Sequence, residues 1–178
     1  MRGLLGKDGL TARLSTFVAL AGAIGVLLIA AAVVFDILMR WLFNSPILAV
    51  DDLNPFNIAV VVAAFFPLCL IGRHFVTIRF LGRAMGDKAH LFLEFVGAVA
   101  TLFVFILYAW QLLRYAAKLT ANGLASGVLE IPQAPWWWVV AIILVFSVLV
   151  QLAVVAETIV AWRKGEMPVL EGSADTGA

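Results

Sequence analysis

The sequence predicts an all-α integral membrane protein with four transmembrane helices and a short amphipathic helix at the membrane interface, in the second connector. Three observations favour this fold class: four runs contain no Asp, Glu, Lys or Arg, hydrophobic residues make up 64% of the chain against 13% charged, and mean hydropathy is +1.07. Because about 20 helical residues cross a hydrocarbon core about 30 Å thick, each run can span a bilayer. The runs are residues 17–35, 53–72, 95–113 and 131–156.

We assign the spans to residues 14–38, 53–72, 90–113 and 133–160, in a single four-helix transmembrane domain over residues 1–165. The first run follows a basic leader, but it is longer than the apolar region of a signal peptide, which has about 7–15 residues. It is therefore interpreted as a retained span. Residues 166–178 are rich in small residues and mixed in charge, which predicts a disordered tail.

The first span is rich in small residues, and Ala21 and Gly25 have the four-residue spacing that permits close helix contact. In the second connector, Arg79 and Arg83 would share one face of a helix, so residues 74–86 are predicted to lie along the interface. At the start of the fourth span, the tryptophans at 136–138 are typical of the outer headgroup level, where an indole is both buried and hydrogen-bonded.

Positive charges predict the topology. The leader, the second connector and the tail after the fourth run contain nine Lys and Arg residues, against three in the first and third connectors. Cytoplasmic segments are the ones enriched in these residues, so both termini are expected in the cytoplasm. The nine are Arg2, Lys7, Arg13, Arg73, Arg79, Arg83, Lys88, Arg163 and Lys164; the three are Arg40, Arg114 and Lys118.

Four charged residues cluster around the short first connector. Asp36 and Arg40 are four residues apart, so they share a helix face and can pair. Asp51 and Asp52 precede the second span, near a helix N-terminus, where the helix dipole favours acidic side chains. Each is interpreted either as a structural charge at a helix end or as a contact with a partner subunit.

Enzymatic chemistry has little support in the sequence. Glu94 and Glu157 lie near the cytoplasmic ends of their spans. The carboxylate of a proton-coupled antiporter would instead lie several turns inside a span. His74 and His90 flank the second connector, so neither is placed to ligate haem inside a bundle. Cys69, the only cysteine, cannot form an intramolecular disulfide. We expect no catalytic residue, cofactor, metal site or nucleic-acid partner.

The segment after the first span resembles a known family. Residues 36–47, DILMRWLFNSPI, resemble the Arg-aromatic-x-Phe-Asn-x-Pro signature of the small, Q-type (DctQ-like) membrane subunit of tripartite ATP-independent periplasmic (TRAP) transporters. Three further pieces follow in the family's order: an acidic pair, a basic stretch containing histidine, and a Leu-x-Ile-Pro element. They correspond to Asp51-Asp52, to residues 73–78 and to residues 129–132.

This resemblance implies a subunit without catalysis in a bacterial or archaeal inner membrane. Such a subunit braces a larger multi-span permease that holds the ion and substrate sites, while a periplasmic solute-binding protein delivers an organic acid. An ion gradient, usually of sodium, drives uptake. The expected partners are the large permease subunit, the binding protein and the lipid bilayer, with Asp36, Arg40, Asp51 and Asp52 as candidate partner contacts.

Three alternatives stay open. An autonomous small antiporter or exporter would need an embedded carboxylate, and a membrane anchor of a redox enzyme would show a haem absorbance band. An accessory subunit of another tripartite uptake system differs only modestly in sequence pattern.

Overall fold

The protein is described by a computed structural model that covers residues 10–71, 87–127 and 129–164. Four helices make up nearly all of these residues: α1 (Leu10–Phe43), α2 (Leu48–Ile71), α4 (Asp87–Asn122) and α5 (Ala134–Lys164). Each contains a segment long and apolar enough to cross a membrane. The predicted all-α membrane fold with four transmembrane helices is therefore confirmed. The interfacial helix predicted at residues 74–86 lies outside the described residues.

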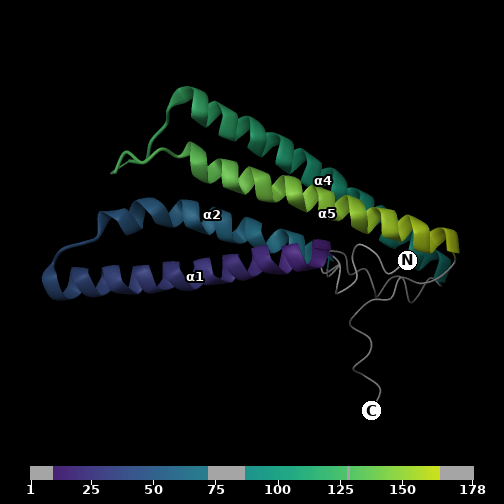
Figure 1. Cartoon of the computed structure of the whole chain (residues 1–178), viewed down its shortest axis with the longest axis horizontal. Coiled ribbons are helices and arrows are strands. Elements are labelled where there is room, and N and C mark those ends of the chain that lie inside the picture. The colour runs from purple at the N-terminus through teal and green to yellow at the C-terminus, as the bar shows by residue number, and fades with distance from the viewer. Residues whose placement is uncertain (1–9, 72–86, 128, 165–178) are drawn as a thin grey trace, which may run out of the picture.

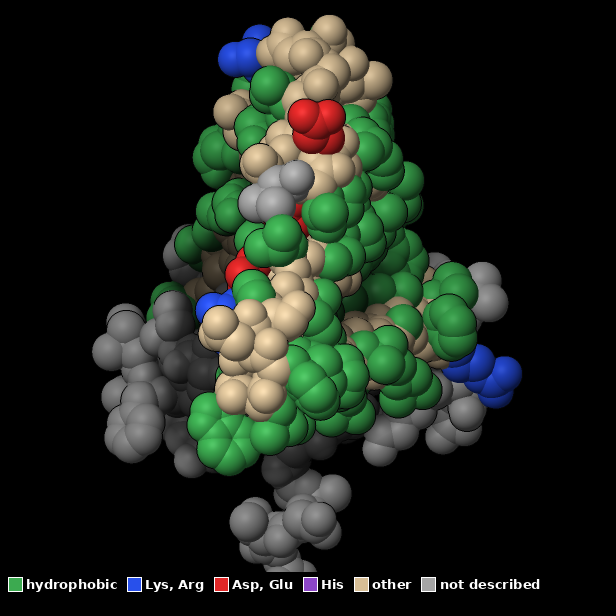
Figure 2. Space-filling view, turned by 90° about the vertical axis from the view of Figure 1, so that its left-hand side faces the viewer, with side chains coloured by type: hydrophobic (Ala, Val, Ile, Leu, Met, Phe, Trp, Pro, Cys, Tyr) green, Lys and Arg blue, Asp and Glu red, His purple; other side chains and the backbone are tan. Residues whose placement is uncertain are grey.

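The helices form an open row. The main helix contacts join α1 to α2, α2 to α5, and α5 to α4, so α1 and α4 lie at the two edges (Figure 1). The first and third connectors lie together at the end of the row away from the start of α1, and we call this the connector end. Figure 2 looks at this end and shows acidic side chains among hydrophobic ones.

Three of the helices are longer than a membrane span requires. α1, α4 and α5 have 34, 36 and 31 residues, and at 1.5 Å per residue each is longer than about 45 Å. α4 continues past the predicted end of its span at residue 113, because Ala116 and Leu119 are buried and extend the packing surface. Arg114 ends the apolar run without ending the helix.

Two kinds of packing hold the row together. Around α5, larger side chains interlock: Phe105 of α4 meets Phe66 of α2 edge-on at 5.4 Å and lies in a cluster with Leu144 and Val150. Between α1 and α2 the backbones approach closely, since a Cβ atom on Gly22 would lie only 2.8 Å from Cβ of Ala64.

A Cβ atom on Gly25 would lie 3.0 Å from Val61, so the predicted role of Gly25 in close contact is confirmed. The prediction that Ala21 shares this contact was wrong. Ala21 is exposed, and Gly22, one position further along the helix, makes the contact. Small residues occupy almost every turn of this span, so their spacing alone does not identify the face that meets α2.

Candidate functional site at the connector end

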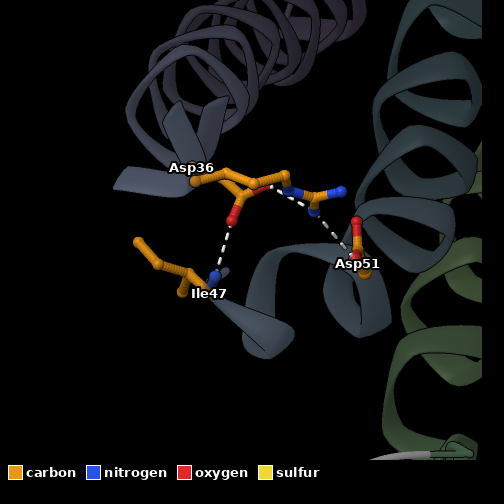
Figure 3. A network of polar contacts seen from close by, with 4 residues as sticks. Asp36, Ile47 and Asp51 are labelled. Carbon is orange, nitrogen blue, oxygen red and sulfur yellow. Dashed lines mark hydrogen bonds and ion pairs between the residues drawn. The ribbon is translucent and has the colours of Figure 1, made fainter. Parts of the chain in front are cut away.

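Asp36 is the buried centre of the first polar network (Figure 3). It lies in the last turns of α1, where its side chain is 6% exposed. Oδ1 accepts a hydrogen bond from the backbone N–H of Ile47 at 2.6 Å, and Oδ2 accepts one from Nη2 of Arg40 at 3.0 Å. Ile47 directly precedes α2, whose first N–H groups have no intrahelical acceptor. Asp36 therefore fixes the start of α2 against the end of α1.

The chain can return to Asp36 because the connector turns sharply. Asn44 has a φ of 52°, in the left-handed region that asparagine tolerates better than most residues. Pro46 cannot continue the helix, and α2 begins two residues later at Leu48. These local choices place the N–H of Ile47 one hydrogen bond away from Asp36.

Arg40 and Asp51 form the exposed part of the same network. Nη2 of Arg40 lies 3.5 Å from Oδ2 of Asp51, and the two side chains are 53% and 65% exposed. An ion pair this open contributes little to stability, about 0–1 kcal/mol. The guanidinium has five N–H donors, and only some of them are used by Asp36 and Asp51.

Asp52 is the centre of a second network that joins α2 to the third connector. Its Oδ2 accepts hydrogen bonds from Oγ of Ser126 at 2.8 Å and from the backbone N–H of Leu129 at 2.7 Å. Ser126 Oγ in turn accepts the N–H of Ile131 at 3.1 Å. The third connector is folded back on itself here, because Ser126 N–H also donates to the carbonyl of Ile131 and Glu130 adopts a φ of 52°.

The tryptophan cluster begins α5 directly after this connector. Nε1 of Trp138 donates to Oγ1 of Thr120 at 3.0 Å, and Trp137 meets the ring of Tyr115 edge-on at 5.1 Å. Both partners belong to the part of α4 beyond the predicted span. The cluster therefore packs the extended end of α4 against α5.

The four predicted site residues thus share one end of the molecule but belong to two networks. The predicted pair of Asp36 and Arg40 is confirmed, and Asp51 lies exposed in the first turn of α2. Asp52 differs from the expectation of a capping or solvated charge, because it binds the third connector. No sequence signal near Asp52 identifies Ser126, since the two residues are 74 positions apart.

Sequence reasoning missed one polar contact between the spans. Gln151 of α5 is 3% exposed, and its Nε2 donates to the carbonyl of Ala98 on α4 at 2.9 Å. The position of Gln151 deep within an apolar run was the available signal, because an amide buried in lipid or protein needs a partner.

The other sequence candidates add no further site. Glu157 is exposed and Cys69 is half-buried. His74 and the side chains of His90 and Glu94 lie outside the described residues. Among the residues that the structure describes, no three His, Cys, Asp or Glu side chains are grouped so that they could hold a metal ion.

Comparison with known proteins supports the resemblance found at the first connector. The sequence model of one family, described as tripartite ATP-independent periplasmic transporters, DctQ component, matches residues 13–163. No curated protein and no solved structure gives a significant match. The matched segment includes all four helical spans and both polar networks, so it covers most of the chain. The chain therefore belongs to the DctQ family and is the small, multi-pass membrane component of a TRAP transporter.

Proposed function

We propose that this chain is a static scaffold without catalysis, which braces the large permease subunit of its transporter. That subunit moves an organic acid, delivered by a periplasmic solute-binding protein, into the cell on an ion gradient. The inner membrane is its proposed location, with both termini in the cytoplasm. The proposal starts from family membership and from the distribution of Lys and Arg, nine in the two terminal segments and the second connector against three in the first and third connectors.

The observation that supports bracing most directly is the open row of helices. A chain that enclosed its own solute pathway would surround it with helices, whereas here α1 and α4 are edge helices with broad apolar faces. Most of each span is not buried within the chain. In both edge helices, only 11% of the most apolar 18-residue stretch is buried. Such faces are suited to lipid and to the helices of a larger subunit.

The polar networks support a division of roles at the connector end. Asp36 and Asp52 are occupied by hydrogen bonds within the chain, so we assign them to holding the connectors in shape. Arg40 and Asp51 are more than half exposed, so we assign them to contact with a partner. The partner facing this end is the binding protein if the connector end is periplasmic, as the charge distribution predicts.

The direct experiment is purification of the tagged chain from its native membrane in mild detergent, with mass spectrometry of the proteins that accompany it. We expect a stoichiometric permease subunit of many spans. A homo-oligomer that exports a solute by itself would contradict the proposal and favour the small-antiporter alternative.

A second measurement separates the two roles. Substitutions R40E and D51K should leave the amount of copurified permease unchanged but reduce uptake that depends on the binding protein. If the double variant has normal uptake, the assignment of Arg40 and Asp51 to partner contact is wrong.

A further inference from the structure

The edge helix α4 presents a stripe of exposed side chains that changes character along its length. Phe103, Leu107, Trp110, Arg114 and Lys118 follow one another at spacings of three or four residues, so they share one helix face. All five are exposed. The stripe is apolar first, then aromatic, and ends in two cations.

Among the described residues, no carboxylate forms an ion pair with either cation. The ion pairs of Arg40 with Asp36 and Asp51 lie on other helices, away from Arg114 and Lys118. The guanidinium of Arg114 instead lies over the ring of Trp110, 5.2 Å from its centre. This cation–π contact orients Arg114 along the stripe and leaves its N–H edges available for an anion.

The length of the stripe matches one leaflet of a bilayer. From Phe103 to Arg114 the helix rises about 16 Å, close to half of a hydrocarbon core about 30 Å thick. With Arg114 at the phosphate level, Trp110 therefore lies at the interface, where its ring is favoured, and Phe103 near the middle of the membrane.

We infer that this stripe binds an anionic phospholipid. The phosphate lies between Arg114 and Lys118, and an acyl chain runs along Trp110, Leu107 and Phe103. Arginine suits this ligand because its planar guanidinium forms paired hydrogen bonds with phosphate oxygens. A zwitterionic choline lipid is disfavoured, since its ammonium group would approach two cations. This inference does not depend on the proposed scaffold role.

The test uses the full chain with whatever subunits copurify, examined by native mass spectrometry in detergent with added phosphatidylglycerol or phosphatidylcholine. The wild type should bind phosphatidylglycerol preferentially. In the double variant R114Q/K118Q its affinity should fall about 25-fold, since each cation near an anionic surface contributes about fivefold. W110L should lower the affinity less than the double variant does, because it keeps both cations and removes only the ring that orients Arg114.

R13Q is the matched control, because Arg13 is an exposed cation near the opposite end of the membrane domain. It should leave the preference unchanged. Equal phosphatidylglycerol binding by the double variant and the wild type would overturn the inference, and so would an equal loss in R13Q. If R114Q/K118Q releases the permease subunit but retains the lipid, the stripe is a protein interface and the inference is wrong.

Discussion

The first and third connectors lie at the same end of the molecule, and each is held by one aspartate that accepts a backbone N–H and a side-chain donor. Asp36 binds Ile47 and Arg40, which are 11 and 4 residues away. Asp52 binds Leu129 and Ser126, which are more than 70 residues away. The first network therefore stabilises one helical hairpin, α1–α2, whereas the second joins that hairpin to α4–α5.

The two hairpins also differ in how their helices pack together. α1 and α2 meet through Gly22 and Ala64, where the absence of a side chain allows close approach. α4 and α5 meet through larger side chains and a hydrogen bond from Gln151. Both kinds of contact can hold helices together in a membrane. Because lipid is as apolar as the helices, the hydrophobic effect does not drive them together, and packing or hydrogen bonding must do so.

The largest effect is expected from D36A. It removes the buried acceptor of the Ile47 N–H and leaves Arg40 paired with Asp51 alone, which should lower the free energy of unfolding by about 3 kcal/mol. Reversible unfolding in mixed micelles measures this. D51A is the control, and because Asp51 is exposed it should change stability by less than about 1 kcal/mol. Equal effects of the two variants would refute the central role of Asp36.

G22V should have the next largest effect. The new side chain would collide with Ala64 and force α1 away from α2, at a cost of about 2 kcal/mol. Ala21→Val is the matched control, since Ala21 is the exposed neighbour on the same helix, and this variant should be close to wild type. If A21V destabilises the chain as much as G22V, the assigned contact face of α1 is incorrect.

D52A separates the two connectors. Because water can reach the partly exposed site, the expected loss of stability is only about 1 kcal/mol. Hydrogen exchange is more informative: the amide of Leu129 should exchange faster in D52A, with Ile47 unchanged, and D36A should give the reverse pattern. Faster exchange at both amides in either variant would show that the networks are coupled. S126A keeps the bond from Leu129 and should preserve protection at that amide.

Gln151→Leu should have the smallest effect. Hydrogen bonds between membrane helices contribute about 0.6 kcal/mol on average, and leucine fills much of the space of the amide. S147A provides the baseline, because the hydroxyl of Ser147 bonds only to its own helix, at the carbonyl of Ile143. A loss of several kcal/mol in Q151L would mean that the hydrogen bond of Gln151 stabilises the α4–α5 pair more than the close packing at Gly22 stabilises the α1–α2 pair.

Much of this architecture could be predicted from the sequence. Charge-free runs of sufficient length identify the four spans, because a charged side chain within the hydrocarbon is costly in every fold. The pair of Asp36 and Arg40 was predictable for a similar reason: a spacing of four residues on one helix requires no knowledge of the rest of the chain.

The tertiary structure alone decided three further features: the open row of helices, the use of Gly22 instead of Ala21, and the bond from Asp52 to the third connector. Each depends on which faces of distant helices meet. In a span that is apolar all round, periodicity does not distinguish those faces, since lipid and protein present similar surfaces. The sequence by itself determined the helices and their local charge pairs. The packing of the helices against one another determined which of their faces are buried and which are exposed.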